Sequence, residues 1–350
     1  VMSAASQKIV HPHLLEWATG NPVVTDLTGQ IEHITLAGKH DEHVDLVMVA
    51  PSTANTVSKI ACGIDDTPVT TTVSSAIGAA IPVFIVPAMH ESMYDHPTVK
   101  DNISKLVKIG VHVMKPRMEE AKAKIPTPEA IVEEVLGILG PKDMVGRHFL
   151  LTAGPTRGWF DRVRFITNPA TGKMGIALSK ELLGRGANVT LILGPSSERA
   201  PHTADVIPVE TTHEMLSKVM EALESKDLTA FISTAAVLDY EPEEKEDRKR
   251  PSGKAYSVDL VPTPKIIEEV RKKYKTLPVI GFKVESGVSD DELEERARVK
   301  IKNGICNLVI ANDASRKGVA FGTDTNEVLI VGENEYLKHV PLSPKREIAR

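Results

Sequence analysis

The sequence predicts an α/β protein of two domains, each with a mainly parallel sheet between layers of helices. Three observations support this prediction. The chain has 350 residues, which suits two domains of ordinary size. Short apolar runs such as those at 44–52 and 81–89 end in proline and small residues, as buried parallel strands do. Segments with helical spacing lie between these runs, and this alternation is typical of βαβ units.

The first half is expected to hold three buried strands, at 44–52, 81–89 and 111–116. A helix is predicted at 127–140, because Thr127 can cap it and Pro128 fits its first turn. A short polar link follows at 141–146. We therefore place the domain boundary after residue 140, with domains at 1–140 and 141–350.

The second half starts a new βαβ series at Arg147. A strand at 148–153 ends at Gly154 and Pro155, and a helix is expected to open near Thr171–Lys173. The further elements predicted are a glycine turn at 184–186, strands at 189–193, 228–236 and 277–282, helices at 212–225 and 264–274, and a hairpin at 326–340.

Both ends of the chain are unusual. Residue 1 lies in what reads as the end of a strand followed by a helix, and the last residues read as a helix that has just begun. We expect the first domain to be incomplete at its N-terminus and the second to be slightly incomplete at its C-terminus.

Composition excludes several classes of protein. Hydrophobic residues make up 41% and charged residues 25%, as in ordinary globular enzymes. The net charge of −5 argues against nucleic-acid binding through a basic face. The sequence has no apolar run long enough to span a bilayer and no visible signal peptide. Cys62 and Cys306 are expected to be reduced and buried, so we predict a cytoplasmic enzyme.

The stretch "ITNPATGKMG" at 166–175 lies between a predicted strand and a predicted helix. It is not an ordinary P-loop, because Thr167 stands where that motif has glycine and Met174 where it has Ser or Thr. A helix that opens at Gly172 would still offer free N–H groups to an anion. The alternative is that Thr171 only caps the helix. The charge run at 241–254 is likewise either a solvated loop or a mobile lid over phosphates.

In the first half, polar residues follow two buried strands, in "APSTANT" (50–56) and "PAMHESMY" (87–94). Doubly wound folds bind ligands at the carboxyl ends of such strands. His33 is a further candidate, although a lone histidine is more often a surface or core residue.

Taken together, these stretches resemble the bifunctional flavoproteins of coenzyme A biosynthesis, in which a phosphopantothenoylcysteine decarboxylase is fused to a phosphopantothenate–cysteine ligase. The resemblance covers nearly the whole chain. The decarboxylase part matches in "GNPVVTDL", "HITLA", "APSTANT" and "PAMHESMY". The ligase part matches in "TAGPTR", "ITNPATGKMG", "AAVLDY", "PSGK", "PTPKII", "GFKVES" and "ANDAS…FGTDTNEV". It implies a flavodoxin-like first domain and a Rossmann-like, nucleotide-binding second domain.

For the second domain, the resemblance implies that CTP or ATP, with Mg²⁺, activates 4′-phosphopantothenate as an acyl-nucleotide, which cysteine then attacks. The metal ligands are unknown. Asn168 would orient the acyl-nucleotide, and Lys249 would contact the triphosphate, with Arg248 or Lys245 as alternatives. The residues at nucleotide-contacting positions are Asp239, Pro264, Lys265, Ile266, Ile267, Phe282 and Lys300, with Lys302 as an alternative to Lys300.

For the first domain, the resemblance implies FMN-dependent decarboxylation, in which thiol oxidation provides a sink for the electrons left by CO₂. His33 would be the acid–base group. The residues at flavin contacts are Thr53, Ala54, Asn55, Thr56 and Ala88. His90 stands where the family commonly has the asparagine that binds the substrate carboxylate.

Two further departures affect the first domain. The family's lid cysteine is absent from "KPRMEEAKAKIPTPE", so Lys122, Lys124 or water would have to donate the proton. The glycine-rich loop for the flavin phosphate would belong to the missing first βα unit.

Two alternative functions remain open. One is a ligase whose flavoprotein half is non-catalytic or regulatory. The other is a nicotinamide-dependent oxidoreductase, which the lack of a G-x-G-x-x-G after a strand disfavours. The resemblance also implies a homo-oligomer with trimeric flavoprotein units and dimeric ligase units. Leu14, Leu15 and Trp17, on a short predicted helix, are candidate interface residues, unless they pack on their own sheet.

Overall fold

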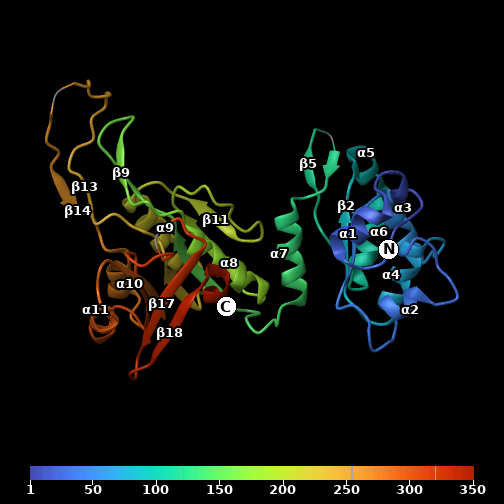
Figure 1. Cartoon of the computed structure of the whole chain (residues 1–350). Coiled ribbons are helices and arrows are strands. Elements are labelled where there is room, and N and C mark those ends of the chain that lie inside the picture. Colours follow the sequence, from blue (N-terminus) through green and yellow to red (C-terminus); the bar gives the residue numbers. More distant parts are fainter. Residues whose placement is uncertain (121, 254, 320) are drawn as a thin grey trace. The chain divides into compact units, whose positions relative to one another are not determined.

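The computed structural model describes residues 1–120, 122–253, 255–319 and 321–350. The chain forms two compact units, Val1–Leu139 and Gly140–Arg350 (Figure 1). Each unit has its own mainly parallel sheet with helices packed against it, and this confirms the predicted α/β class.

The N-terminal unit is built on a parallel sheet of β1 (Val47–Ser52), β2 (Val83–Pro87) and β4 (His112–Val113), in the order β1-β2-β4. The three expected strands are thus present but shorter than predicted. Its helices are α1 (Pro12–Thr19), α2 (Glu32–Ala37), α3 (Ala54–Cys62), α4 (Pro68–Gly78), α5 (Glu91–Tyr94), α6 (Pro97–Lys108) and α7 (Pro128–Leu139), with a 3₁₀ turn at Ser6–Lys8.

Strand β2 explains how this unit is layered. All five of its residues are buried, and successive side chains point to opposite faces. Val83 and Ile85 belong to one core cluster with residues of α3, α4 and α6, whereas Phe84 and Val86 pack against α7. Because both faces are covered, the strand is a continuous apolar run rather than an alternating one.

The region that lacks the lid cysteine forms a small antiparallel sheet. Its strands are β3 (Met89–His90), β6 (Lys122–Lys124) and β5 (Arg117–Glu119), in the order β3-β6-β5. The sheet therefore joins this region to the polar stretch that follows β2.

The C-terminal unit holds an eight-stranded sheet in the order β11-β10-β7-β12-β15-β16-β17-β18. The strands are β7 (His148–Ala153), β10 (Asn188–Leu193), β11 (Asp205–Pro208), β12 (Ala230–Ser233), β15 (Val279–Glu285), β16 (Leu308–Asp313), β17 (Thr325–Gly332) and β18 (Leu337–Pro344). The helices are α8 (Lys173–Gly184), α9 (Thr212–Ser225), α10 (Ile266–Lys273), α11 (Asp290–Lys302) and α12 (Lys345–Ala349).

The order of the parallel strands determines where a ligand can bind. Numbered along the chain, the six parallel strands lie in the order 3-2-1-4-5-6, with β7 as the first. In such a sheet the connections that follow β7 and β12 run in opposite directions. The carboxyl ends of these two strands therefore border a crevice. The last two strands, β17 and β18, extend the sheet in antiparallel fashion.

The segments around the predicted loops form two further antiparallel pairs, β8 (Arg157–Trp159) with β9 (Phe165–Thr167), and β13 (Tyr240–Pro242) with β14 (Leu260–Pro262). Figure 1 shows the chain between β13 and β14 as a long arm that extends away from the sheet. The charge run at 241–254 belongs to this arm, so its base is a paired hairpin rather than an open loop. Lys254, at the end of the "PSGK" stretch, lies outside the described residues.

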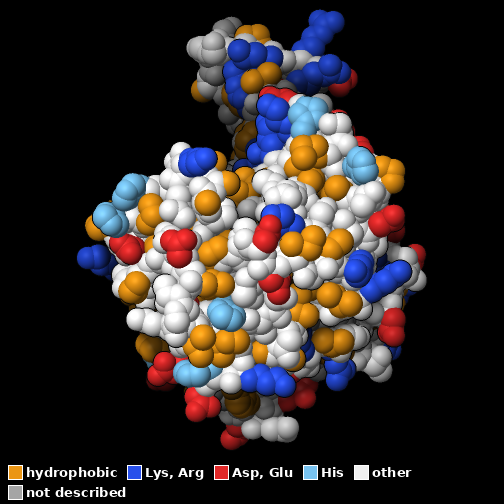
Figure 2. Space-filling view, turned by 90° about the vertical axis from the view of Figure 1, so that its right-hand side faces the viewer, with side chains coloured by type: hydrophobic (Ala, Val, Ile, Leu, Met, Phe, Trp, Pro, Cys, Tyr) orange, Lys and Arg blue, Asp and Glu red, His pale blue; other side chains and the backbone are white. Residues whose placement is uncertain are grey.

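Four expectations need correction. The first residues form no strand, and the helix expected at 264–274 is shorter, at Ile266–Lys273. Cys62 is exposed, whereas Cys306 is buried as expected. Trp17 on α1 is 83% exposed, so it does not pack on its own sheet. Figure 2, which shows a face of the N-terminal unit, has hydrophobic side chains in several small patches between charged ones.

Candidate functional sites

A pocket lies at the carboxyl ends of the parallel strands of the C-terminal unit, where the strand order predicts a crevice. It is bordered by residues that follow β7 and β12, by residues in the carboxyl-terminal halves of β15 and β16, and by the turn that precedes α8. The residues that line it are Gly154, Ala170, Thr171, Gly172, Lys173, Met174, Gly175, Thr234, Ala236, Phe282, Val284, Asn312, Ala314, Val319, Phe321, Gly322, Asn326 and Lys345.

The amino end of α8 forms one wall of this pocket. Gly172 is the N-cap and has a φ of 82°, a conformation that glycine adopts without strain. No side chain caps the helix, so the alternative in which Thr171 is the cap is wrong. The first N–H groups of α8 are therefore left for a ligand or water, and the helix dipole favours an anion there.

Two lysines add positive charge to the same pocket. Lys173 Nζ lies 2.6 Å from Asp324 Oδ1 and 3.0 Å from the Gly322 carbonyl oxygen, and 3.7 Å from Glu198 Oε1. The hydrogen bond to Asp324 raises the pKa of Lys173. Lys345 donates to the Thr323 carbonyl oxygen, and its pKa is lowered by burial and by the positive charge of Lys173. Carboxylate and carbonyl oxygens therefore pair with both lysine ammonium groups of the pocket.

Asn168 is held beside this pocket by the loop that follows β12. Its Nδ2 donates to the carbonyl oxygens of Ala236 (3.0 Å) and Val237 (3.2 Å). The preceding Thr167 donates to the Thr156 carbonyl oxygen at 2.8 Å. These contacts fix the orientation of the Asn168 amide next to Ala236, which lines the pocket.

Apart from Lys300 and Lys302, the other predicted nucleotide residues divide into four groups. Phe282 lines the pocket, and Asp239 and Lys265 form an ion pair after β12 and before α10. Ile266 is 4% exposed and belongs to the hydrophobic core, and Ile267 packs against that core, so their side chains face inward. Pro264, between Lys265 and the buried Thr263, is half-buried.

Lys300 and Lys302 are not brought to this pocket. They lie in the last turn of α11, and the Lys300 carbonyl oxygen accepts from the backbone N–H of Ile305, just before β16 begins. A crossover helix that starts near the carboxyl end of one strand ends near the amino end of the next. The two lysines therefore lie near the amino ends of the strands, whereas the pocket that Phe282 lines is at their carboxyl ends.

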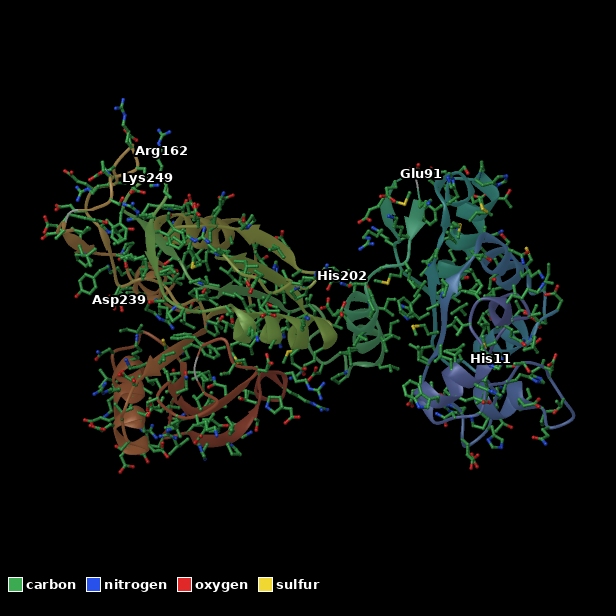
Figure 3. All side chains as sticks on the ribbon, turned by 45° about the horizontal axis from the view of Figure 1, so that its top comes forward. His11, Glu91, Arg162, His202, Asp239 and Lys249 are labelled. Atoms are coloured by element: carbon green, nitrogen blue, oxygen red, sulfur yellow. The ribbon has the colours of Figure 1, made fainter. Side chains whose placement is uncertain are left out.

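Lys249 lies on the arm, and Figure 3 shows it near Arg162, with Asp239 closer to the sheet. The buried Asp161 fixes this part of the arm: one carboxylate oxygen accepts from the N–H groups of Val163 and Arg164, and the other from Arg250. Lys245 instead stacks 5.4 Å from the centroid of the Trp159 ring. None of Lys245, Arg248 and Lys249 lines the pocket at α8 in the described part of the chain.

In the N-terminal unit, the predicted flavin contacts converge at the carboxyl ends of β1 and β2. Thr53 is the N-cap of α3 and accepts from Thr56 N at 3.4 Å, so Ala54, Asn55 and Thr56 form its first turn. The Ala88 N–H donates to the Ser52 carbonyl oxygen at 2.9 Å and joins the second strand end to this turn.

Two buried polar atoms in this unit lack partners among the described residues, His33 Nδ1 and Ser52 Oγ. His33 lies on α2, and Ser52 immediately precedes the α3 cap. Buried polar groups are normally hydrogen-bonded, so each is available to a polar ligand. The unpaired Ser52 hydroxyl and the amino end of α3 together fit a site for a flavin nucleotide, which has a ring system with several polar atoms and a phosphate group.

His90 lies on β3, two residues after Ala88. Its Nδ1 lies 3.1 Å from Ser92 Oγ, and its direct cross-strand partner on β6 is Lys122. Lys124 instead pairs with Glu120 (2.8 Å) and Glu119 (3.5 Å). Of the two lysines considered as replacements for the missing cysteine, Lys122 is therefore the one opposite His90.

Lys345, Asp324, Asn312 and Asn326 were not predicted from the sequence. Lys345 reaches the pocket only because β17 and β18 reverse the chain, and no local motif marks it. Asn312 and Asn326 are each at most 6% exposed and lie in the "ANDAS…TNEV" stretch, whose position at a strand end was the available signal.

Comparisons with known proteins agree with this arrangement in both units. The family model described as flavoprotein matches residues 1–140, and the one described as DNA/pantothenate metabolism flavoprotein C-terminal domain matches residues 144–350. A coenzyme A biosynthesis bifunctional protein CoaBC of Thermococcus kodakarensis is 48% identical over 349 residues, which is 100% of this chain and 85% of that protein.

The chain belongs to the CoaBC family. Another member, from Methanocaldococcus jannaschii, is 36% identical over 340 residues, 97% of this chain and 81% of its own length. The solved structure of the DNA/pantothenate metabolism flavoprotein from Streptococcus pneumoniae has a TM-score of 0.51 and 27% identity, and covers 58% of this chain and 95% of that one. None of the helices among the described residues is both long enough and apolar enough to cross a membrane.

Proposed function

We propose that this CoaBC-family chain carries out two consecutive steps of coenzyme A biosynthesis. The C-terminal unit ligates cysteine to 4′-phosphopantothenate with CTP or ATP, and the N-terminal unit decarboxylates the product to 4′-phosphopantetheine. The observation that carries the proposal is the 48% identity to a bifunctional relative across the whole chain. The pocket at α8 and the paired strand ends at β1 and β2 supply one site in each unit.

The ligase step needs a phosphate-rich substrate held close to a carboxylate. The amino end of α8, Lys173 and Lys345 provide N–H donors and positive charge for phosphate oxygens. Asn168, fixed by two carbonyl oxygens, would orient the acyl-nucleotide for attack by the cysteine amine. Lys249, on the arm, would add charge to the triphosphate only if the arm closes on the pocket or reaches the pocket of a second copy.

Mg²⁺ would enter with the nucleotide. The described residues contain no group of three or more His, Cys, Asp or Glu side chains placed to hold a metal. Magnesium commonly binds through substrate phosphates and one or two carboxylates. This mode suits a pocket in which Asp324 and Glu198 flank Lys173.

In the N-terminal unit, FMN would be held by the first turn of α3, Ser52 and Ala88. The bound flavin supplies the oxidation that makes loss of CO₂ possible. His33, through its unpaired Nδ1 or through Nε2, would accept or donate a proton. His90 would bind the substrate carboxylate, and Lys122, its cross-strand partner, would add charge there or supply the proton that a cysteine gives elsewhere in the family.

The test is a product analysis on the full-length protein. It is incubated with 4′-phosphopantothenate, cysteine, Mg²⁺ and either CTP or ATP, with and without FMN, and products are identified by mass. We expect 4′-phosphopantothenoylcysteine without FMN and 4′-phosphopantetheine with it. Absence of amide with both nucleotides would contradict the proposed ligase. We also propose a cytoplasmic site of action, where nucleoside triphosphates and reduced cysteine are available.

A second candidate is an active ligase with a non-catalytic flavoprotein half. The hairpin β5–β6, without a cysteine, in place of the usual lid favours it. In the same experiment this candidate predicts accumulation of the amide, with no CO₂ released even when FMN is bound. Release of CO₂ would exclude it.

A further inference from the structure

The described residues of the loop between β16 and β17 close one side of the pocket at the amino end of α8, which we call the phosphate pocket after its proposed ligand. Ala314, Val319, Phe321 and Gly322 of this loop line the pocket. The α carbon side of Gly322 faces the amino end of α8, since a Cβ on Gly322 would lie 4.0 Å from Thr171 Cγ2. The position of the loop therefore decides how tightly the pocket encloses an anion.

The end of this loop is fastened inside the pocket. Asp324 pairs with Lys173 at 2.6 Å, and the Gly322 carbonyl oxygen accepts from the same ammonium at 3.0 Å. A phosphate that binds Lys173 would compete with Asp324 for it. This fastening can therefore be lost at the moment when a ligand arrives.

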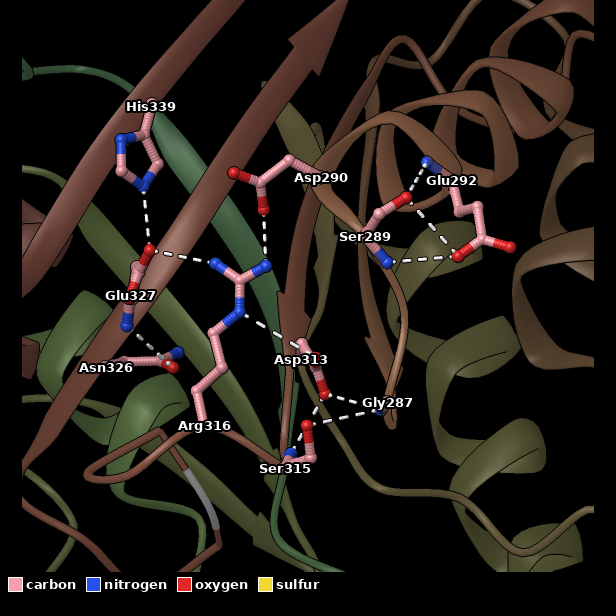
Figure 4. A network of polar contacts seen from close by, with 10 residues as sticks. All are labelled: Gly287, Ser289, Asp290, Glu292, Asp313, Ser315, Arg316, Asn326, Glu327 and His339. Atoms are coloured by element: carbon pink, nitrogen blue, oxygen red, sulfur yellow. Dashed lines mark hydrogen bonds and ion pairs between the residues drawn. The ribbon is translucent and has the colours of Figure 1, made fainter.

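The start of the loop is fastened outside the pocket, by Arg316. Its guanidinium contacts three carboxylates from three elements: Asp290 at the start of α11, Asp313 at the end of β16, and Glu327 on β17 (Figure 4). The distances are 2.9 Å to Glu327 Oε1 and 3.7 Å to Asp313 Oδ2. None of these four residues lines the pocket.

The carboxylates around Arg316 are held by further hydrogen bonds. Asp313 is 4% exposed, and its Oδ1 accepts from the N–H groups of Gly287 and Ser315, each at 2.9 Å. Glu327 also contacts His339 Nε2 at 2.9 Å, and its own N–H donates to Asn326 Oδ1, a side chain that lines the pocket. The guanidinium therefore joins the loop to fixed points on the sheet and on α11.

We infer that Arg316 is a positioning residue for the phosphate pocket, which holds the β16–β17 loop in place when an anion displaces Asp324 from Lys173. One arginine balances three carboxylates at this point. Without it, the carboxylates repel one another, and the loop loses the fastening that does not depend on Lys173. The inference rests on the proposed nucleotide-binding function of the same pocket.

The experiment measures binding of CTP, ATP and inorganic pyrophosphate to the full-length protein by calorimetry. We expect Arg316→Gln to weaken binding about tenfold, within the range that mutations in such networks produce. In buffer without Mg²⁺, Asp324→Asn removes the carboxylate that competes for Lys173, so we expect it to bind pyrophosphate as tightly as the wild type or more tightly. If the loss of any ion pair simply disordered the loop, both variants would bind pyrophosphate more weakly than the wild type.

Two further variants separate charge from shape. Arg316→Gln combined with Glu327→Gln removes one repelling carboxylate and should recover part of the affinity. The control is Arg298→Gln, because Arg298 pairs at 2.6 Å with Glu294 on its own helix and does not contact the loop. Its affinity should equal that of the wild type.

The experiment distinguishes failure of the proposed nucleotide-binding function from failure of the inference about Arg316. If the wild type binds none of the three probes, the proposed function of the pocket fails. If the wild type binds and Arg316→Gln binds equally well, the pocket stands and the inference about Arg316 is overturned. Hydrogen exchange gives an independent readout: Arg316→Gln should increase exchange in 314–324 but not in β7 or β10.

Discussion

The Asn168 amide shows how a single residue links the fold to the chemistry. Its Nδ2 donates to two carbonyl oxygens of the loop after β12. Such a donor pair is possible for an amide and not for a carboxylate, which would face the two carbonyl oxygens with a negative charge. The structure thus provides a reason for an asparagine at this position that is independent of its proposed contact with the acyl-nucleotide.

We predict that Asn168→Asp still releases pyrophosphate from the nucleotide but forms little amide. The change should raise the activation free energy of amide formation by about 2–4 kcal/mol, as loss of an oxyanion donor does. Pyrophosphate release and amide formation are measured separately on the same sample. Asn168→Ala is the companion variant, since it lacks the added charge; amide formation at the wild-type rate in both would remove Asn168 from the mechanism.

His33→Asn is predicted to retain FMN and to abolish CO₂ release. The amide keeps a similar size and one nitrogen near the position of Nδ1, whereas the basic imidazole is lost. Flavin fluorescence reports retention, and trapped CO₂ reports activity. Unchanged CO₂ release would show that a group other than His33 transfers the proton.

Asp313 gives a prediction about pH. Its backbone hydrogen bond from Ser315, with those of Gly287 and Val288, lowers its pKa from the ordinary 3.8 to about 2, while Arg316 lies beside it with Asp290 and Glu327. A lowered carboxylate pKa stabilises the folded state above the ordinary pKa, and this stabilisation is lost as the pH falls from about 4 to about 2. The stability difference between wild type and Asp313→Asn should therefore be constant near neutral pH and shrink below pH 4. Urea unfolding at pH 7, 4 and 3 measures it, and an equal difference at all three would contradict the lowered pKa.

At the scale of elements, α8 depends on a close approach to the sheet. A Cβ on Gly175 would lie 2.5 Å from Ala153 Cβ on β7, so only glycine allows the amino end of the helix to reach the strand ends. We predict that Gly175→Ala displaces this end, destabilises the unit by about 1–3 kcal/mol, as overpacking does, and weakens pyrophosphate binding. The control is Gly78→Ala at the end of α4, where a Cβ meets nothing within 4 Å. Retained affinity in Gly175→Ala would show that the helix end does not bind the anion.

Elements that depend on local pattern were predicted well from the sequence. Strand β7 and helix α9 have the predicted bounds, because an apolar run between turn residues and a Thr–Glu capping box are local signals. The capping of α8 was less predictable, since Thr171 and Gly172 both suit that position and only the backbone conformation decides between them. The family resemblance, rather than local pattern, implied a nucleotide contact for Ile266, and its apolar side chain packs in the core.

The family resemblance names candidate site residues where a motif is continuous in sequence, as in Thr53–Thr56 or around Asn168, and their roles stay predictions. Lys345 and Asp324 could not be found in this way, because they reach Lys173 only through pairing of strands far along the chain. The pairing of Lys122 with His90 depends in the same way on the register of β3 and β6.

At the scale of the whole molecule, the exposed helix α1 supports the expected self-association. Trp17 is 83% and Leu14 56% exposed, and no residue of α1 is buried. We predict that light scattering on the full-length protein gives a mass several times the 38.0 kDa of one chain, and that Trp17→Glu lowers both this mass and flavin retention. Glu16→Gln, on the same helix, is the control. A monomer that decarboxylates fully would place the flavin site within one chain.

The outer edge of the eight-stranded sheet limits which assemblies can form. Among the residues that the structure describes, strand β18 pairs with β17 alone, so its other side is an open sheet edge. Pro341 and Pro344 have no N–H, and Lys338 and His339 carry polar side chains on the same strand. A neighbouring copy that tried to continue the sheet would miss hydrogen bonds and meet charge, as on many edges protected against aggregation. The chain therefore carries a built-in barrier to open-ended fibre growth at the strand that delivers Lys345 to the pocket.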